Sequence, residues 1–367
     1  MKILHILDSL NRGGVEMLAL DVCRNAKKND LDVSFVATGG GTLEVDFRQS
    51  DVNFFRLNRR LPIDLLVVGK LRQIIKTQQI QIVHSHQAVA GIHAYLATLG
   101  TNVKHVLSFS GYYSDTKNRQ TTKFLVPRMA ANIPCSKGML QWLIEVEKLK
   151  TSRNFHVIYN GVDPKRIAYS GENLKTELKI DESARLFGIV SHFYAAPRKD
   201  HITLCKAFVK VAKKLPDWHL IVVGKTEAGA EAKFDECVRI CHENNLVDRV
   251  HFLGQRDDLA KVVNSLDVYI FSSLHEGLPI ALMEAMLAEK ACILSDIPPH
   301  LEVSNNGESA EVFKTQNADD LAGKLIKLAE NETFRNELAR KAKQFAETTF
   351  SIEVHLKNLK NLYQKII

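Results

Sequence analysis

Short apolar segments alternate with helical patterns along most of the chain, and this alternation occurs in two successive series. Segments rich in Ile and Val, such as Lys2–Leu7 and Val268–Phe271, have the length and composition of buried strands. The segments between them, such as Asp64–Thr77, repeat apolar residues at helical spacing. Strands that alternate with helices predict parallel sheets covered on both faces. We therefore predict an α/β fold with two doubly wound, Rossmann-like domains that face each other across a cleft.

The two series define the expected elements and domains. The expected strands are Lys2–Leu7, Val33–Ala37, Val52–Leu57, Ile80–Ser85, Val103–Ser108 and Ile133–Ser136, then Leu186–Ser191, His219–Val223, Val250–Leu253, Val268–Phe271 and Ala291–Leu294. The expected helices include Asp64–Thr77, Ala88–Leu99, His201–Lys214, Ala230–Asn244, Leu259–Ser265 and Ile280–Ala288. A chain of 367 residues has room for two domains. We place them at 1–165 and 166–345, and we expect the helical segment 346–367 to pack back across both.

Positive charge is concentrated in the first domain. Residues 1–165 hold 22 Lys and Arg against 13 Asp and Glu, a net charge of +9, whereas the rest of the chain holds 27 against 29, a net charge of −2. This asymmetry indicates an anionic partner, either a membrane surface or an acidic substrate, and no nucleic acid is expected. The basic residues that could rim an acceptor site are Arg56, Arg59, Arg60, Lys117, Arg119, Lys123 and Arg128, with an ordinary solvated surface as the alternative.

The start of the chain and its cysteines favour the cytoplasm. The first residues lack the apolar core and cleavage site of a signal peptide, and no apolar run approaches the ~20 residues that cross a bilayer. The six cysteines are scattered, which favours reduced thiols over a disulfide framework. We therefore expect a cytoplasmic protein that can contact the inner face of the membrane.

In the first domain, two motifs follow strands at the end where ligands of parallel sheets bind. Gly13 and Gly14 precede a helix, whose free N–H groups suit a phosphate, although a tight turn is the alternative. His84 and His86 end the fourth strand. A metal would need a third ligand, and the sequence offers none. Hydrogen bonding to substrate is therefore favoured over a metal, and a structural role for one histidine remains open.

In the second domain, His192 follows the first strand, and Arg198 and Lys199 stand at a loop–helix junction. A lysine at such a junction complements a phosphate, whereas a solvated basic turn is the alternative.

The most specific motif is HEGLPIALME at 275–284, which follows a strand and opens a helix. Glu276 and Glu284 are eight residues apart, slightly more than two helical turns, so both can lie along one extended ligand and accept sugar or ribose hydroxyls. The N–H groups of Gly277 and Leu278 can bind phosphate oxygens. The alternative is two solvated helix charges. The apolar residues around them instead predict a buried helix, in which carboxylates need partners.

Together these segments resemble glycosyltransferase family 4. The matching segments, in order, are GGVE at 13–16, HSHQAVAG at 84–91, PCSKGM at 134–139, YNGVD at 159–163, RKDH at 198–201 and HEGLP at 275–279, with the pair Glu276 and Glu284. The resemblance covers nearly the whole chain. It implies a GT-B fold and a retaining enzyme that moves a sugar from a nucleoside-diphosphate sugar to an acceptor hydroxyl. It also implies that no metal or other cofactor is needed. The acceptor would be a saccharide or lipid-linked saccharide in the synthesis of cell-surface polysaccharide or glycolipid.

The resemblance also implies residue roles. The implied donor-binding residues are Gly13, Gly14, His192, Arg198, Lys199, Glu276, Gly277, Leu278 and Glu284, the implied catalytic residues are Glu276, Lys199 and His86, and the acceptor-side residues are His84, His86 and Ser110. Lys199 would bind the diphosphate, Glu276 would hold the transferred sugar, and Glu284 would bind the ribose.

Two positions depart from the family pattern. His192 stands where the family usually has Arg, which removes one fixed cation unless Arg198 substitutes for it. Ser110 lies in a loop where the family often has His, so that Ser110 or His86 would make that contact. Two alternatives stay open: a nucleotide-sugar epimerase of the same fold, and a non-catalytic nucleotide-sugar binding protein.

Overall fold

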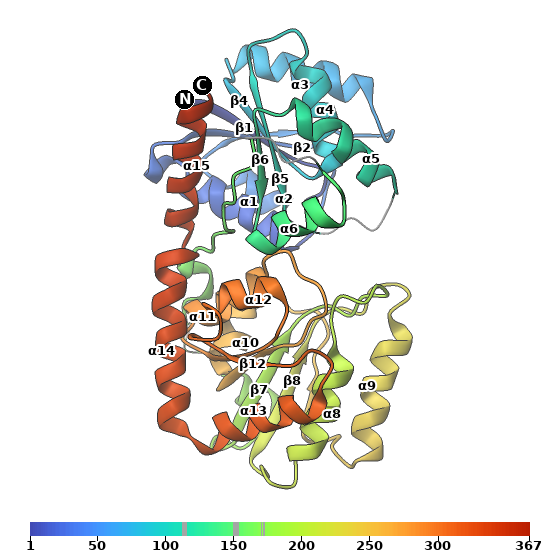
Figure 1. Cartoon of the computed structure of the whole chain (residues 1–367), viewed down its shortest axis with the longest axis vertical. Coiled ribbons are helices and arrows are strands. Elements are labelled where there is room, and N and C mark those ends of the chain that lie inside the picture. Colours follow the sequence, from blue (N-terminus) through green and yellow to red (C-terminus); the bar gives the residue numbers. More distant parts are fainter. Residues whose placement is uncertain (112–115, 150–153, 170, 172) are drawn as a thin grey trace. The chain divides into compact units, whose positions relative to one another are not determined.

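The chain folds into two compact α/β units. The computed structural model describes residues 1–111, 116–149, 154–169, 171 and 173–367. One unit comprises Met1–Val162 and Phe350–Ile367, and the other comprises Asp163–Thr349. Each unit contains a six-stranded parallel sheet flanked by helices (Figure 1). The observed boundaries between the units follow Val162 and Thr349, whereas the predicted boundaries follow residues 165 and 345.

In the first unit the strands follow the order β3-β2-β1-β4-β5-β6. Its elements are β1 (Lys2–Leu7), α1 (Gly14–Asn25), η1 (Lys27–Asn29), β2 (Asp32–Ala37), α2 (Glu44–Arg48), β3 (Asn53–Arg56), α3 (Leu65–Thr77), β4 (Ile82–His86), α4 (Ala88–Thr98), β5 (Lys104–Phe109), α5 (Thr116–Leu125), η2 (Val126–Arg128), β6 (Ala131–Pro134), α6 (Lys137–Glu145) and α15 (Ile352–Ile366). All six expected strands are present, and the largest shift is in β6, which begins and ends two residues before the expected Ile133–Ser136.

In the second unit the strands follow the order β12-β11-β10-β7-β8-β9. Its elements are η3 (Pro164–Ile167), α7 (Leu174–Leu178), β7 (Arg185–Val190), α8 (His201–Val211), β8 (Trp218–Val223), α9 (Glu231–Glu243), β9 (Val250–Phe252), α10 (Leu259–Ser265), β10 (Val268–Phe271), α11 (Ile280–Leu287), β11 (Ala291–Ser295), α12 (Pro298–Val303), β12 (Glu311–Phe313), α13 (Ala318–Glu330) and α14 (Glu332–Thr349). Strand β12 is not among the expected strands, because a three-residue edge strand that begins with Glu311 shows no apolar run.

The order of the strands reverses between β1 and β4 in the first sheet and between β7 and β10 in the second. Ligands of open parallel sheets bind at such points, beyond the carboxyl ends of the strands. Gly13 and Gly14 follow β1, and His84 and His86 lie in the last residues of β4. Likewise His192 follows β7, and the segment 275–279 follows β10. The topology therefore brings the predicted residues of each unit to one point of its sheet.

The C-terminal segment forms two helices that belong to different units. Helix α14 packs against α11 and β11 of the second unit, whereas α15 packs against α1 of the first. The helices are separated at Phe350–Ser351, where Ser351 caps α15 by accepting a hydrogen bond from the Val354 N–H. Residues 346–349, which were expected in the final helix, therefore belong to α14.

The loop after β2 approaches the loop after β1 closely enough to require glycine. A Cβ atom on Gly41 would lie 2.0 Å from the Leu10 carbonyl carbon and 2.2 Å from the Asn11 nitrogen. Because both are backbone atoms, the clash cannot be relieved by a rotamer change. The contact at Gly41 therefore fixes the loop that leads to Gly13.

We predict that Gly41→Ala destabilises the protein by at least about 2 kcal/mol, because overpacking against backbone has no inexpensive relaxation. The matched control is Gly69→Ala within α3, where a Cβ meets nothing within 4 Å. That change should stabilise the protein by about 0.5–1 kcal/mol through helix propensity. Chemical unfolding of both variants measures the two effects, and equal midpoints would contradict the assignment.

Among the described residues, no helix combines the length and the apolar character needed to span a membrane. All six cysteines are buried and free.

Candidate active site

In the second unit, Lys199 and Glu276 form an ion pair between two segments that backbone hydrogen bonds hold together. The Asp200 N–H donates to the Ser272 carbonyl (3.1 Å), and the Leu274 N–H donates to the Arg198 carbonyl (2.7 Å). These bonds fix the start of α8 beside the loop that follows β10. Lys199 Nζ therefore meets a carboxylate oxygen of Glu276 across 77 residues of sequence.

The pair is largely shielded from water, and an aromatic ring lies against the lysine. The side chains of Lys199 and Glu276 are only 12% and 13% exposed, and Lys199 Nζ lies 3.9 Å from the centroid of the Phe271 ring. Burial lowers the pKa of Lys199, and the charge of Glu276 opposes that effect. The ammonium group is thus held in place in a poorly hydrated site, where its interaction with an anion is stronger than in water.

Helix α11 is buried, as predicted, and its second carboxylate also has a partner. Glu284 is 7% exposed, and its Oε1 forms an ion pair with Arg166 Nη2 at 2.7 Å. Arg166 belongs to η3, which packs against α11. Sequence reasoning missed Arg166. A buried carboxylate needs a partner, so the sequence indicates that Glu284 has one. It does not indicate which residue, because Arg166 is 118 positions away in the sequence.

The predicted phosphate-binding amides lie directly before α11. Gly277 and Leu278 are buried, and both already take part in contacts within the chain. The helix begins after Pro279, whose side chain makes no capping hydrogen bond, so the first turn lacks a side-chain cap. The positive end of the dipole of α11 therefore faces the loop that carries Glu276.

His192 and Arg198 complete the predicted donor-binding set. His192 Nδ1 accepts a hydrogen bond from the Lys225 N–H (2.9 Å), and burial lowers the pKa of this half-buried ring. The imidazole is therefore neutral near pH 7. The Arg198 guanidinium lies 5.4 Å from the centroid of the Tyr194 ring. Of these predicted residues, Arg198 and Lys199 carry the positive charge.

In the first unit, an acidic residue lies where a phosphate is predicted. Gly13 caps α1 without any side-chain hydrogen bond, and a Cβ on Gly13 would lie 2.6 Å from Glu16 Oε2. Burial raises the pKa of Glu16 to about 7, and nearby Asp8 contributes to the rise. Glu16 is thus partly protonated near neutral pH, which lowers its repulsion of a phosphate beside Gly13 and Gly14.

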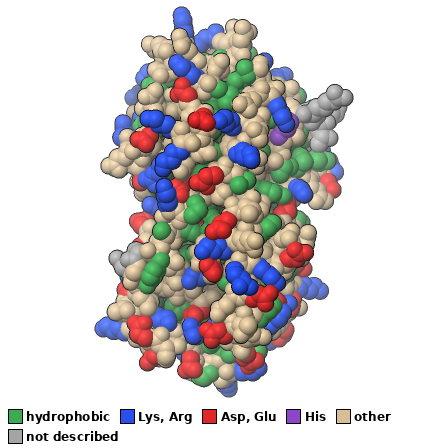
Figure 2. All heavy atoms as spheres, turned by 90° about the vertical axis from the view of Figure 1, so that its left-hand side faces the viewer, with side chains coloured by type: hydrophobic (Ala, Val, Ile, Leu, Met, Phe, Trp, Pro, Cys, Tyr) green, Lys and Arg blue, Asp and Glu red, His purple; other side chains and the backbone are tan. Residues whose placement is uncertain are grey.

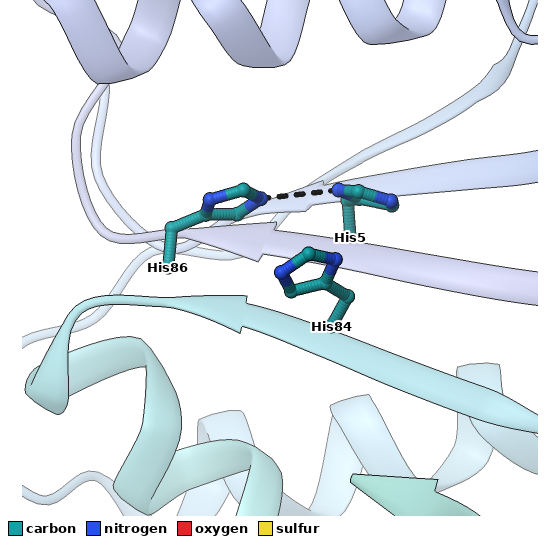
Figure 3. A group of neighbouring side chains, drawn as sticks. All are labelled: His5, His84 and His86. Carbon is teal, nitrogen blue, oxygen red and sulfur yellow. Dashed lines mark hydrogen bonds between the residues drawn. The ribbon is translucent and has the colours of Figure 1, made fainter. Parts of the chain in front are cut away.

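The two predicted histidines of β4 belong to a buried hydrogen-bonded chain. In the register of the sheet, His84 lies opposite His5 of β1, and His86 lies opposite Ser108 of β5. His84 Nε2 bonds to Ser108 Oγ (2.6 Å) and His84 Nδ1 to Tyr363 Oη (2.5 Å). Tyr363 Oη also meets His5 Nε2 (3.3 Å), and His5 Nδ1 meets His86 Nε2 at 3.1 Å (Figure 3).

Every member of this chain can both donate and accept a hydrogen bond. Two self-consistent arrangements therefore exist, with all donors pointing either toward Ser108 or toward His86. In the first, His86 Nδ1 is an acceptor, and in the second it is a donor. Either way the chain is complete without any charged ring.

This chain of hydrogen-bonded side chains borders a small pocket, which Ser110, the third predicted acceptor-side residue, also lines. The pocket has a volume of about 10 Å³, the room of roughly one water molecule. His84, His86, Ser108 and Ser110 line it, together with His355 and Asn160 among other residues. In the described part of the chain, His86 Nδ1 is buried without a hydrogen-bond partner. The structure thus brings His84, His86 and Ser110 together at one pocket.

The same histidines correct one sequence inference. His5 supplies the third ring that the sequence did not reveal, and one nitrogen from each of His5, His84 and His86 lies within 4.8 Å of the others. Neutral imidazoles are competent zinc ligands. Here, however, these rings bond to one another, to Tyr363 and to Ser108, so a metal would have to displace those bonds.

Burial of these rings predicts a loss of stability in acid. Burial lowers the pKa of His86 to about 3 and of His355 to about 4, and it lowers those of His5 and His84 well below 6.5. It also lowers the pKa of His105 in β5, whose Nε2 bonds to Ser85 Oγ (2.7 Å), to about 3. Each ring is neutral when folded and takes up a proton on unfolding below pH 6.5. Each therefore lowers the free energy of unfolding, by up to about 1.4 kcal/mol per pH unit, as the pH falls from 6.5 toward the folded pKa.

We expect His86→Asn to make the free energy of unfolding less dependent on pH. Between pH 6.5 and pH 4.5, the slope of that free energy against pH should fall by about 1 kcal/mol per pH unit. Chemical unfolding at several pH values measures it, with exposed His242→Asn as the control. An unchanged slope in the His86 variant would show that this ring is not held neutral by the fold.

Comparisons with known proteins agree with this architecture. A family model described as "Glycosyltransferase Family 4" matches residues 12–166, and one described as "Glycosyl transferases group 1" matches residues 171–345. Among curated relatives, the N-acetyl-alpha-D-glucosaminyl L-malate synthase of Bacillus anthracis is 23% identical over 88% of this chain and 84% of its own length. The UDP-Gal:alpha-D-GlcNAc-diphosphoundecaprenol alpha-1,3-galactosyltransferase of Escherichia coli is 21% identical over 99% of this chain and 96% of its own.

Solved structures share the fold over the full chain. Anabaena HepE in complex with UDP and glucose has a TM-score of 0.86 at 18% identity, with 100% of both chains covered. A glycosyltransferase of Rickettsia africae has a TM-score of 0.84 at 20% identity, with 100% of this chain and 98% of the other covered. Two Rossmann-like units in one chain, with these structural neighbours, define a GT-B fold. The two family models together span nearly the whole chain, and the protein therefore belongs to the group 1 glycosyltransferases.

Proposed function

We propose that this glycosyltransferase is a retaining, metal-independent enzyme that uses a nucleoside-diphosphate sugar. The observation that carries the proposal is the buried Lys199–Glu276 pair beside the uncapped start of α11. Lys199, assisted by Arg198, binds the diphosphate. Glu276 holds hydroxyls of the transferred sugar, and Glu284, oriented by Arg166, accepts from the ribose. The first unit contributes the acceptor side through His84, His86 and Ser110.

The demanding step is departure of the nucleoside diphosphate, which gains negative charge as its bond to the anomeric carbon breaks. Lys199 and the dipole of α11 stabilise that charge, and removal of one such fixed donor raises a barrier by about 3 kcal/mol. The acceptor oxygen bonds to the same face of the anomeric carbon. Its proton passes to the departing phosphate oxygen, so that Glu276 positions the sugar and forms no covalent bond.

Metal independence leads to a direct prediction. Prolonged dialysis against a chelator should leave turnover unchanged, because lysine and helix dipole take the place of a cation at the diphosphate. Turnover of the dialysed enzyme, measured with and without added Mg²⁺, Mn²⁺ or Zn²⁺, tests this. Loss of activity that a metal restores would contradict the proposal and direct attention to the three histidines around His84.

The acceptor is proposed to be a saccharide or a lipid-linked saccharide. The Escherichia coli relative is named for a diphosphoundecaprenol-linked acceptor, which supports this class. We propose a cytoplasmic enzyme that works at the inner face of the membrane. Part of the predicted basic rim is neutralised, since Arg56 pairs with Glu44 and Arg119 with Glu147. On the face in Figure 2, basic and acidic side chains are interspersed.

A panel of nucleotide sugars tests the reaction. Release of nucleoside diphosphate that requires an acceptor extract, with the anomeric configuration kept in the product, is the expected result. Epimerised nucleotide sugar without an acceptor would indicate the epimerase, and tight binding without turnover would indicate a non-catalytic binding protein. An inverted anomeric centre would exclude the retaining mechanism. No nucleic-acid partner is proposed.

A further inference from the structure

One segment of the first unit exposes large apolar side chains in close succession. Leu61, Ile63, Leu65 and Leu66 are 60%, 50%, 73% and 77% exposed. They occupy the loop after β3 and the first two positions of α3, and we call residues 61–66 the apolar tip. Elsewhere in the described residues, exposed large apolar side chains occur singly or as the pair Ile144 and Val146. Monomeric soluble proteins rarely gather such side chains on their surface without a use.

The fold holds the apolar tip in this exposed state. Asp64 caps α3 by accepting hydrogen bonds from the Leu66 N–H (3.0 Å) and the Val67 N–H (3.4 Å). It also accepts from the Arg60 N–H (2.9 Å), while its own N–H donates to His93 Nε2 (3.0 Å). The Asp64 carboxylate and amide are therefore both used to fix the tip.

The helix cannot turn to bury the leucines. Its opposite face carries Val67, Leu71 and Ile75, which are buried in the core of the unit. Rotation of α3 about its axis would expose these three side chains in exchange for Leu65 and Leu66. The leucines thus remain at the surface for as long as the unit stays folded.

Along the sequence, the charges next to the apolar tip have one sign, and the half-buried Asp8, which interacts with Arg59, comes from the loop after β1. From residue 57 to residue 79 the chain contains five cations, Arg59, Arg60, Lys70, Arg72 and Lys76, and a single acid. That acid is Asp64, which is buried as the helix cap. Exposed leucines flanked by basic residues, with no exposed acid among them, complement an apolar layer covered by negative headgroups.

The apolar tip also lies on the side of the sheet where the carboxyl ends of the strands meet. It follows the carboxyl end of β3, and because all six strands are parallel, this is the edge at which β4 ends with His86. The pocket lined by His86, Ser108 and Ser110 therefore lies at the carboxyl ends of the strands, as the tip does. A surface-bound acceptor that carries a lipid would need both features on that edge.

We infer that the apolar tip inserts into the interfacial region of a membrane with anionic lipids, and that Arg60 and Lys70 bind its headgroups. The inference deepens the proposed function, since it rests on a lipid-linked acceptor for its purpose. Leu65 and Leu66 enter the acyl boundary, while the capped start of α3 sets the depth. The apolar tip enters the membrane from one side.

Co-sedimentation of the full-length protein with vesicles tests this inference. Vesicles of equal parts phosphatidylglycerol and phosphatidylcholine should bind the protein, pure phosphatidylcholine should bind it weakly, and added salt should weaken binding. The double variant Leu65→Ser/Leu66→Ser should lower the partition coefficient at least about tenfold. The control Val45→Ser/Val247→Ser, at positions 62% and 60% exposed, should leave it unchanged.

Charge and insertion are tested separately. Arg60→Gln/Lys70→Gln should weaken binding to the anionic vesicles alone, whereas Lys210→Gln/Lys214→Gln in the second unit should not. Leu66→Trp should show a blue-shifted fluorescence and quenching by brominated lipid when vesicles are added. Unchanged fluorescence, or equal binding of the serine variant and its control, would overturn the inference.

Two further outcomes are decisive. If the unliganded protein sediments as a dimer without lipid and the serine variant as a monomer, the apolar tip contacts a second copy and membrane docking is wrong. Vesicle binding is measured without nucleotide sugar. Intact binding without any turnover would therefore count against the proposed reaction alone, and turnover on a soluble acceptor without vesicle binding would count against the docking alone.

Discussion

Glu276→Gln is expected to lower turnover by about 10²–10³-fold while nucleoside diphosphate binding changes little. Glutamine keeps the size of the side chain but loses the charge that accepts sugar hydroxyls, and this interaction matters most in the transition state. Lys199 loses its partner but keeps its place over the Phe271 ring, so its ammonium group stays available to the diphosphate. The effect should therefore appear in kcat and not in the affinity for the nucleotide.

Turnover with a nucleotide sugar and calorimetric titration with the nucleoside diphosphate measure the two quantities. The matched control is Glu289→Gln, which removes the carboxylate of an exposed pair with Lys343. Equal losses of kcat in both variants would contradict a special role for Glu276. A glycosyl adduct trapped on Glu276 would show that it is a nucleophile and not a positioning residue.

Lys199→Met is expected to lower kcat/KM by about 10³-fold and to weaken diphosphate binding as well. The variant removes the fixed cation that stabilises the departing diphosphate. It also leaves Glu276 partly buried without its partner, which should cost about 2–4 kcal/mol of stability. Steady-state kinetics, nucleotide titration and chemical unfolding measure the three effects.

A second variant separates the electrostatic role of Lys199 from its effect on stability. Lys199→Met/Glu276→Gln removes the unpaired charge, so it should recover most of the lost stability but not the lost affinity for the nucleoside diphosphate, which Glu276→Gln alone leaves nearly unchanged. The control Lys210→Met lies in α8, the helix that follows Lys199, and removes a cation from an exposed pair with Asp319. Recovery of diphosphate affinity in the double variant would mean that Lys199 acts only through the fold.

The regular elements that position the site could be predicted from local pattern. The strand Val268–Phe271 and the helix Leu259–Ser265 have the predicted bounds, and α11 is buried as its apolar composition indicates. The topology then carries His86 and Glu276 to the carboxyl ends of their strands. This part succeeds because each signal is contained in a few consecutive residues.

The partners of the site residues could not be predicted in the same way. His5 lies inside a strand and has the appearance of a single polar interruption, and Tyr363 comes from a helix 358 positions further along the chain. Arg166 lies in a short turn with no periodic signal. The position of Glu16 over Gly13 depends on how α1 begins. These contacts follow from the three-dimensional arrangement of each unit and have no local sequence signature.

The most direct test of the central claim is a crystal structure of the enzyme with a nucleoside-diphosphate sugar. We expect the diphosphate to lie within hydrogen-bond distance of Lys199 Nζ at the start of α11, with the sugar on Glu276 and the ribose on Glu284. A diphosphate bound elsewhere, with residues 276–284 making no contact to the ligand, would contradict the claim.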